Sequence, residues 1–394
     1  MRRRDLFAGA LALPMSGASL CAVAVPRGDG PIAAPDNDLM VSLPDLLAIA
    51  GVPGISIGVV SKGRATWEAH LGTTGAPDRP VGHAMIWKAA SLSKQVSGYA
   101  ALRLVDTGAL DLDRPLACYL GDELADAAAR RITARHVLTH SSGLPNWRRT
   151  RAIMSAFAPG SRFLYSGEGY FLLARCIERI TGIGFDAYMR KAVFDPLGMD
   201  SSSYFWRSDL AARLAPGHHW EGDAWDDAAW RDRLHARIVA SGEDEARWTL
   251  DRVAAAMTAT AGEALLPGTV YYPNPAMSLM TTAGDFLRVM ARFVTGFGDG
   301  LDLSPRLRAL AAAPAIRVNR AVSWGLGWGI ETAGETQYLF QNGSLAGACT
   351  SFALLHPPSE TGIVAFANHI NGQRVMERVF RTVTGGDHPV FLWA

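Results

Sequence analysis

Residues 87–94, Trp87-Lys88-Ala89-Ala90-Ser91-Leu92-Ser93-Lys94, place a serine and a lysine three positions apart at the start of a helical pattern. Apolar residues then recur at helical spacing as far as Val105, and Thr107-Gly108 ends the pattern. Residues three apart share one helix face, so the Lys94 side chain can reach Ser91 Oγ. A serine hydroxyl needs a neighbouring base to become a nucleophile, and a neutral lysine can take its proton. The helix start also supplies backbone N–H groups for a developing oxyanion.

A Ser-x-x-Lys pattern by itself is more often a serine and a lysine on a solvated helix face. Further segments are therefore needed to identify Ser91 and Lys94 as a catalytic pair. The chain has only four lysines, at positions 62, 88, 94 and 191. Five further segments share one order and spacing with a known family: 52–56 (Val-Pro-Gly-Ile-Ser), 104–110 (Leu-Val-Asp-Thr-Gly-Ala-Leu), 132–144 (ending His-Val-Leu-Thr-His-Ser-Ser-Gly-Leu), 194–199 (Phe-Asp-Pro-Leu-Gly-Met) and 278–285 (Ser-Leu-Met-Thr-Thr-Ala-Gly-Asp). Together they resemble the serine β-lactamase and penicillin-binding protein family, and within it the class C-like hydrolases.

The resemblance implies roles for residues outside the Ser-x-x-Lys segment. Tyr165 matches the tyrosine of the family's Tyr-x-Asn motif, which moves the proton between Ser91, Lys94 and the leaving group. Gln341-Asn342-Gly343 falls on the third motif, Lys/His-Thr/Gly-Gly, on an expected edge strand. The backbone N–H groups of Ser91 and Ser344 would then form the oxyanion hole.

Two positions depart from the family pattern. Gly167 stands where the family has an asparagine that bonds the substrate, and Gln341 removes the usual positive charge. Gly167, Gln341, Asn342 and Gly343 are therefore the expected substrate-binding positions, with classical β-lactams disfavoured. We expect Glu168, next to the missing asparagine, to be solvated, and Arg374 is the candidate cation for replacing the lost charge.

Strand patterns at both chain ends and helical patterns between them predict an α+β fold. A β-hairpin is expected over 54–71, strands over 323–332, 337–341, 348–355 and 362–367, and helices over 92–105, 170–180, 283–294 and 376–383. The resemblance implies the β-lactamase/D,D-peptidase-like fold, with an antiparallel sheet built from both termini, flanking helices and a helical insertion domain. We predict a sheet domain from residues 25–80 together with 315–394, a mainly helical domain over 81–314, and a catalytic cleft between them. Residues 25–45 are expected as an irregular lead-in.

The first residues indicate export. Arg2-Arg3-Arg4 precede a mildly apolar run, and Ala22-Val23-Ala24 offers a small-x-small cleavage site, which predicts a signal peptide over 1–24. Arg3-Arg4-Asp5-Leu6-Phe7 is similar to a twin-arginine signal, so we expect a periplasmic or secreted protein without a stable membrane span after signal removal. A net charge of +1 and the lack of a basic stripe argue against nucleic-acid binding. The expected partner is a small ester, amide or D-amino-acid peptide, with no cofactor and no metal.

Three alternatives stay open at this point. Gly54-Ile55-Ser56-Ile57-Gly58 fits the Gly-x-Ser-x-Gly pattern of α/β-hydrolases, although strand-like residues continue through it where that chemistry needs a strand–turn–helix elbow. His136 and His140 have a spacing that suits zinc on a helix but lack a third ligand nearby, which favours a structural role. The changes at Gly167 and Gln341 also fit a catalytically weak, penicillin-binding-like binding or sensor protein.

Overall fold

The computed structural model describes residues 32–393 except 122–123, 125, 221–223, 226–227, 243, 262–272 and 334. Its centre is an eight-stranded antiparallel sheet in the order β2-β1-β12-β11-β10-β9-β8-β7. The strands are β1 (Gly54–Ser61), β2 (Arg64–Gly72), β7 (Ile316–Arg317), β8 (Val322–Trp324), β9 (Gly329–Ala333), β10 (Thr336–Leu345), β11 (Cys349–His356) and β12 (Thr361–Ala367). Because β1 pairs with β12, strands from both ends of the chain lie side by side in one sheet, as the sequence predicts.

The first hairpin shows how local sequence sets the register. β1 and β2 are joined by Lys62-Gly63, and both residues adopt a positive φ. Such a two-residue turn matches the twist of the flanking strands. The pairing runs from Gly54 opposite Gly72 to Ser61 opposite Arg64, with one irregularity after Val59. This is the hairpin that the alternating pattern predicts.

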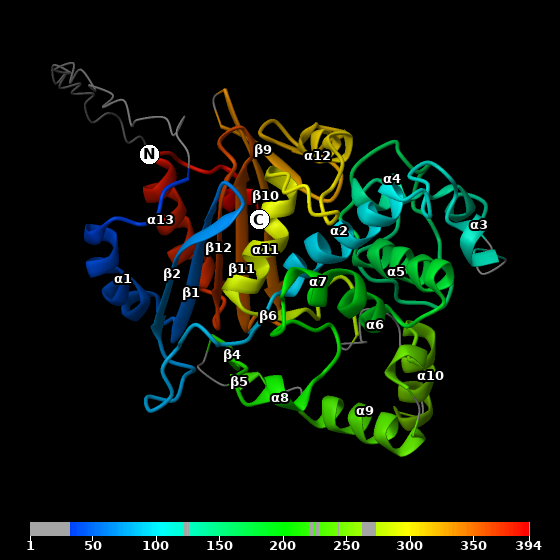
Figure 1. Cartoon of the computed structure of the whole chain (residues 1–394), viewed down its shortest axis with the longest axis horizontal. Coiled ribbons are helices and arrows are strands. Elements are labelled where there is room, and N and C mark those ends of the chain that lie inside the picture. Colours follow the sequence, from blue (N-terminus) through cyan, green and yellow to red (C-terminus); the bar gives the residue numbers. More distant parts are fainter. Residues whose placement is uncertain are drawn as a thin grey trace, which may run out of the picture.

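Helices cover both faces of the sheet (Figure 1). α1 (Asn37–Ala50) and α13 (Gly372–Thr384) pack against each other, and α13 lies on β11 and β12. α11 (Ala283–Val294) packs against β1, β2 and β12 from the other side. Successive β12 residues accordingly belong to separate clusters: Ile363 joins the core with α1 and α13, while Val364 joins the core with α11.

The remaining helices form a layer beside α11, away from α1 and α13 (Figure 1). It includes the 3₁₀ turn η1 (Ala90–Leu92), α2 (Ser93–Asp106), α3 (Ala117–Leu120), α4 (Ala134–Leu138), α5 (Gly167–Thr181), α6 (Phe185–Met189), α7 (Asp195–Leu197), α8 (Ser208–Ala211), α9 (Ala228–Ser241), α10 (Leu250–Ala261) and α12 (Pro305–Ala312). Short two-stranded pairs join β3 (Trp87–Lys88) to β6 (Met280–Thr281) and β4 (Gly217–His218) to β5 (Ala224–Trp225). α14 (Val390–Trp393) is the last described element.

The structure corrects the prediction for the N-terminal lead-in. Residues 37–45 belong to α1, which begins after Asp36, whose side chain accepts a hydrogen bond from Leu39 N. Leu39, Leu43 and Leu47 recur every four residues and are buried, a helical pattern that the many small and polar neighbours obscure. The strand expected over 323–332 is also divided, because residues 325–328 leave the sheet between β8 and β9.

Helix ends follow sequence signals closely. α11 begins after Thr282, whose hydroxyl accepts from Asp285 N, and α5 ends at Gly182 in the left-handed conformation. The predicted signal peptide, residues 1–24, lies outside the described residues. Among the helices described, none combines the length and apolar character that crossing a bilayer requires.

Candidate active site

Ser91 and Lys94 lie together as their spacing predicts. Lys94 is almost fully buried in the first turn of α2, and its Nζ is 3.1 Å from Ser91 Oγ. The same Nζ donates to the carbonyl oxygen of Ala276 at 2.9 Å. These two contacts hold the amine beside the hydroxyl and keep it away from solvent. The pair therefore has the geometry of a nucleophile and its base.

The backbone around Ser91 is held from several directions. Ala90 has φ +48°, a conformation that non-glycine residues rarely adopt, immediately before the serine. Ser351 on β11 donates from Oγ to Ala89 O at 2.7 Å. A Cβ on Gly343 would lie 2.9 Å from Ser91 N, so only glycine lets β10 approach the nucleophile this closely.

That approach brings the expected oxyanion donors into one place. β9 pairs with β10 only through Phe340, so the stretch of β10 after it has one edge free of strand pairing, and η1 packs against β10. Ser344, on this stretch, lines the same cavity as Ser91. The arrangement suits the Ser91 and Ser344 N–H groups as an oxyanion hole.

Tyr165 lies directly over the amine of Lys94, whose Nζ is 4.8 Å from the centre of the Tyr165 ring. The Tyr165 ring also contacts the ring of His140, with centroids 4.3 Å apart. His140 is fully buried, and its Nδ1 accepts a hydrogen bond from Ser166 N at 3.0 Å. Burial, reinforced by the charge of Lys94, holds the pKa of His140 well below its ordinary value. A neutral His140 thus packs against the ring of Tyr165, a contact that was not predicted from the sequence.

Gln341 occupies the place expected from the third motif. Its Nε2 donates to Tyr165 Oη at 3.2 Å, and its Oε1 accepts from Gln95 Nε2 at 3.2 Å. Gln341 is 1% exposed, so these bonds fix its orientation. The residue keeps a hydrogen bond to Tyr165 and carries no charge.

The change at Gly167 has a steric explanation. A Cβ at Gly167 would lie 2.5 Å from Trp147 Cη2, because the indole ring fills the space where a side chain would project. Asn146, next to Trp147, accepts the Gly167 N–H at its Oδ1 (2.9 Å) and the Glu168 N–H at its carbonyl oxygen (2.9 Å). The loop carrying Trp147 is therefore fastened to the start of α5, and the family's asparagine would not fit there.

Glu168 corrects another prediction, that it would be solvated. It is 2% exposed, and its Oε1 lies 3.2 Å from Arg148 Nη1. Burial raises the pKa of Glu168, while the Arg148 charge opposes that shift. The carboxylate consequently fastens the Trp147 loop instead of meeting the substrate.

A cavity of about 190 Å³ opens at the nucleophile. It is lined by Ser91, Tyr165, Asn342, Ser344 and Trp393. None of these five side chains carries a charge. Arg374, the cation considered as a replacement for the family's charge, is exposed on α13 and is not part of this lining.

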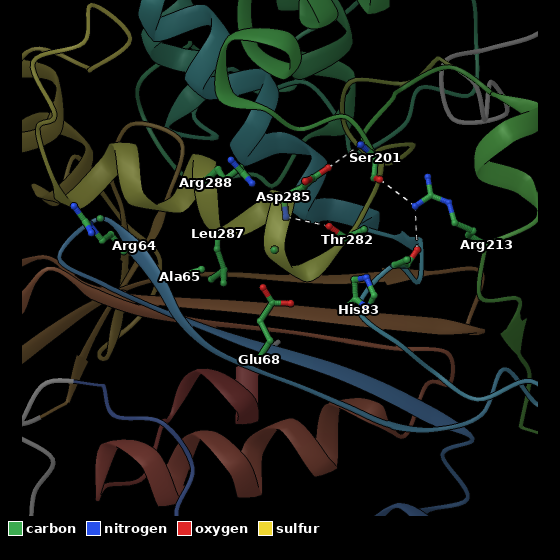
Figure 2. A pocket seen from close by; sticks show the side chains of 13 residues that line it. Arg64, Ala65, Glu68, His83, Ser201, Arg213, Thr282, Asp285, Leu287 and Arg288 are labelled. Carbon is green, nitrogen blue, oxygen red and sulfur yellow. Dashed lines mark hydrogen bonds between the residues drawn. The ribbon is translucent and has the colours of Figure 1, made fainter.

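A larger cavity, of about 610 Å³, lies between β2 and the start of α11 (Figure 2). Several of its polar groups form hydrogen bonds within the fold. Asp285 accepts from Ser201 N and Ser202 Oγ, and Arg213 donates to Ser201 Oγ (3.1 Å). Size does not identify the site here, because the serine–lysine pair lies at the smaller cavity.

Ser56, the alternative nucleophile, is fully buried in the middle of β1, with β2 and β12 paired on either side. Its Oγ is 2.9 Å from His70 Nδ1, and His70 Nε2 is 3.3 Å from Glu68 Oε2. The three residue types resemble a catalytic triad, yet β1 leads into β2, not into a helix. A buried serine within a paired strand lacks the exposed elbow that such chemistry needs. His136, for its part, accepts from Thr133 N at the start of α4, and the described residues contain no group of metal ligands.

The sequence of the chain matches a family model. The model described as "Beta-lactamase" matches residues 43–382, most of the chain. The chain belongs to the beta-lactamase family.

Relatives in the beta-lactamase family differ in what their names say they do. The chain is 32% identical to a lovastatin esterase of Penicillium rubens over 166 residues (32% of this chain, 41% of the relative). It is 27% identical to esterase EstB of Burkholderia gladioli over 252 residues (55% and 60%) and 24% identical to a beta-lactamase of Escherichia coli over 264 residues (58% and 65%). The chain thus spans about 41% to 65% of the length of these curated relatives.

Solved structures confirm the fold. A class C beta-lactamase aligns with a TM-score of 0.66 and 17% identity, covering 88% of this chain and 95% of that one. The octameric penicillin-binding protein homologue from Pyrococcus abyssi aligns with a TM-score of 0.67 and 20% identity, covering 90% and 79%. The predicted β-lactamase/D,D-peptidase-like fold is therefore correct.

Three side chains of the candidate site in this beta-lactamase-family protein were not predicted from its sequence: Trp147, His140 as a neighbour of Tyr165, and Trp393. His140 lies within a segment quoted for the family resemblance, so its motif was a usable signal. Trp147 and Trp393 lie outside every motif, and their roles depend on contacts that only the folded chain creates.

Proposed function

We propose that this protein is an exported, metal-independent serine hydrolase that cleaves neutral esters through an acyl-enzyme on Ser91. The observation that carries the proposal is the buried Lys94 Nζ, 3.1 Å from Ser91 Oγ. Two relatives that are named as esterases support the choice of esters as the substrate class.

In the proposed reaction, Ser91 Oγ attacks the ester carbonyl carbon as its proton passes to Lys94 Nζ. The oxyanion is bound by the Ser91 and Ser344 N–H groups. Tyr165 then relays this proton from Lys94 to the leaving alcohol oxygen, which breaks the ester bond and leaves the acyl group on Ser91. Water attacks the acyl-enzyme by the reverse sequence and releases the carboxylic acid.

The uncharged cavity supports an ester over an anionic substrate. A substrate carboxylate taken out of water needs a paired cation, and a charge-assisted hydrogen bond is roughly twice as strong as a neutral one. Gln341 occupies the cationic position and is bonded to Tyr165 and Gln95. A β-lactam or a peptide with a free C-terminal carboxylate is accordingly the weaker substrate.

Covalent labelling tests the nucleophile. A fluorophosphonate probe should label the natural protein and the Ser56→Ala variant, and should fail to label Ser91→Ala. Label that persists on Ser91→Ala would overturn the assignment. Labelling followed by a single burst of chromogenic ester cleavage, without turnover, would favour the binding or sensor protein instead.

The substrate class is tested by Gln341→Lys. The natural protein should hydrolyse a short neutral ester faster than a cephalosporin or a D-alanyl peptide. The variant should shift kcat/KM toward the anionic substrate by about tenfold if the charge contributes ~1.4 kcal/mol. A natural protein that prefers the carboxylate-bearing substrate would contradict the ester proposal, and Arg374 would then be the next residue to change.

Export is proposed from residues 1–24 and is tested by expression in a Gram-negative host. The mature protein should be recovered from the periplasm with the leader removed, and Arg3→Lys/Arg4→Lys should retain the precursor inside the cell if the twin-arginine route is used. Recovery of full-length protein from the cytoplasm would contradict export.

A further inference from the structure

The last described helix is anchored beside the active site by a buried charged residue. Glu331 on β9 is fully buried, and its two oxygens pair with His388 Nδ1 and accept from Val390 N, each at 2.8 Å. His388 Nε2 lies in turn 2.8 Å from Thr384 Oγ1, at the end of α13. Such buried polar contacts fix one arrangement of a segment, because each unmade bond would cost free energy. α14 therefore has a defined position and is not a fraying end.

This anchoring delivers Trp393 to the catalytic cavity. The ring packs against Phe340, Phe163 and Trp324, with centroids 6.1 to 6.3 Å apart. It remains 37% exposed and lines the cavity that contains Ser91. Its neighbour Leu392 is 89% exposed. One part of the indole is thus packed on the protein, and another part is available to a substrate.

The packing also indicates which end of the substrate Trp393 meets. Tyr165 and Trp393 both contact Trp324, at 5.9 and 6.3 Å between centroids, and both line the cavity. In the proposed reaction Tyr165 protonates the leaving alcohol. The side of the cavity shared by Tyr165 and Trp393 is accordingly the side from which the alcohol departs.

We propose that Trp393 is a specificity-determining residue that binds the alcohol part of the ester and favours aromatic alcohols. The inference rests on the proposed ester hydrolysis and adds the substrate class. Paired aromatic rings gain about 0.5–1.5 kcal/mol beyond the burial of their area. Converted to selectivity, that gain gives roughly a two- to tenfold preference for an aromatic over a saturated ring.

The test compares esters that differ only in the alcohol. For benzyl acetate against cyclohexylmethyl acetate, the natural protein should show the higher kcat/KM for the benzyl ester. Trp393→Ala should lower that ratio by about two- to tenfold, and Trp393→Phe should restore most of it. Leu392→Ala is the matched control on the same helix and should leave the ratio unchanged. The ratio of ethyl hexanoate to ethyl acetate, which varies the acyl part, should be the same in all four proteins.

A covalent readout separates failure of this inference from failure of the proposed function. Methylphosphonothiolates with benzylthio or cyclohexylmethylthio leaving groups form a Ser91 Oγ–phosphorus bond and release the thiol, which takes up the serine proton. Their labelling rates report the Trp393 contact even if no ester is turned over. An unchanged benzyl preference in Trp393→Ala by both readouts, or a shift in the acyl series instead, would overturn the inference. Absence of any labelling would overturn the nucleophile assignment and the inference with it.

Discussion

At the scale of single residues, the proposed role of Lys94 is to accept the proton of Ser91. Its Nζ faces Ser91 Oγ and Ala276 O in a buried setting, so a charge alone would not serve the proposed role. Lys94→Arg keeps the charge but cannot act as a base, because a guanidinium does not deprotonate in proteins. We expect the variant to lose at least about a hundredfold in ester turnover, the lower end for general acid–base catalysis. Near-natural turnover, with an unchanged melting temperature, would show that Lys94 acts only as a charge.

Gly167 and Trp147 depend on each other, because the Trp147 ring fills the space that a side chain at position 167 would occupy. Gly167→Asn should destabilise the protein by about 1–3 kcal/mol through overpacking against the Trp147 ring. Combining it with Trp147→Ala should recover part of that loss, so the two changes will not be additive. Urea unfolding of the two single variants and the double variant measures this coupling. Additive free energies of unfolding would mean that the ring moves aside without cost.

At the scale of helices, Glu178 connects three of them. Its Oε1 accepts hydrogen bonds from Phe185 N, at the start of α6, and from Leu250 N, at the start of α10. Burial raises the pKa of Glu178 to about 8, with the two backbone N–H groups opposing the shift. The carboxyl is thus protonated in the folded protein over a range in which the unfolded chain has ionised.

This shift predicts a pH dependence of stability. With the folded-state pKa above the unfolded value, the contribution of Glu178 is fully present below about pH 4.5 and is lost as the pH rises to about 8. Glu178→Gln keeps an oxygen for both N–H groups and does not titrate. Its free energy of unfolding should therefore decline less between pH 5 and 8.5 than that of the natural protein. Glu377→Gln, on the exposed side of α13, is the control, and equal slopes for all three proteins would contradict the prediction.

At the scale of the whole molecule, the sheet separates α1 and α13 from the Ser91–Lys94 pair, while Tyr165 packs against the same hydrophobic cluster as Leu43. α1 and α13 cover one side of it, while Ser91 and Lys94 belong to the layer with α2 (Figure 1). Leu43 on α1 is fully buried, and Leu43→Ala should cost about 2–5 kcal/mol of stability. The fluorophosphonate labelling rate should stay unchanged at temperatures where the variant is folded. Ile49→Ala, on the same helix but 84% exposed, should alter neither quantity.

A lower labelling rate in folded Leu43→Ala would show that the two faces are coupled. The melting temperature and the rate are measured on the same samples, and the rates are compared only at temperatures where the variant is fully folded, because a folded fraction below one would itself lower the rate. The two measurements together show whether the packing of α1 affects the reactivity of Ser91.

The sequence by itself determined the local features of the structure, those that depend on residues close together in the chain. The Ser91–Lys94 contact spans one helical turn, the β1–β2 hairpin turns at Lys62-Gly63, and α11 begins after Thr282, each within a few residues. The motif order also singled out Tyr165 and Gln341, and the structure places these two residues in contact. α1 was missed although its leucines have helical spacing, because small and polar residues hid the pattern.

Only the tertiary structure decided what surrounds the reacting groups. Trp147 meets Gly167 across 20 positions, Glu168 pairs with Arg148 across another 20, and Trp393 reaches a cavity whose nucleophile lies near the other end of the chain. Local propensity and periodicity carry no information on such encounters, since they depend on how separate elements pack. The proposed chemistry therefore rests on a contact within a single helical turn, while the aromatic side chains proposed to set the substrate preference are brought together by long-range packing.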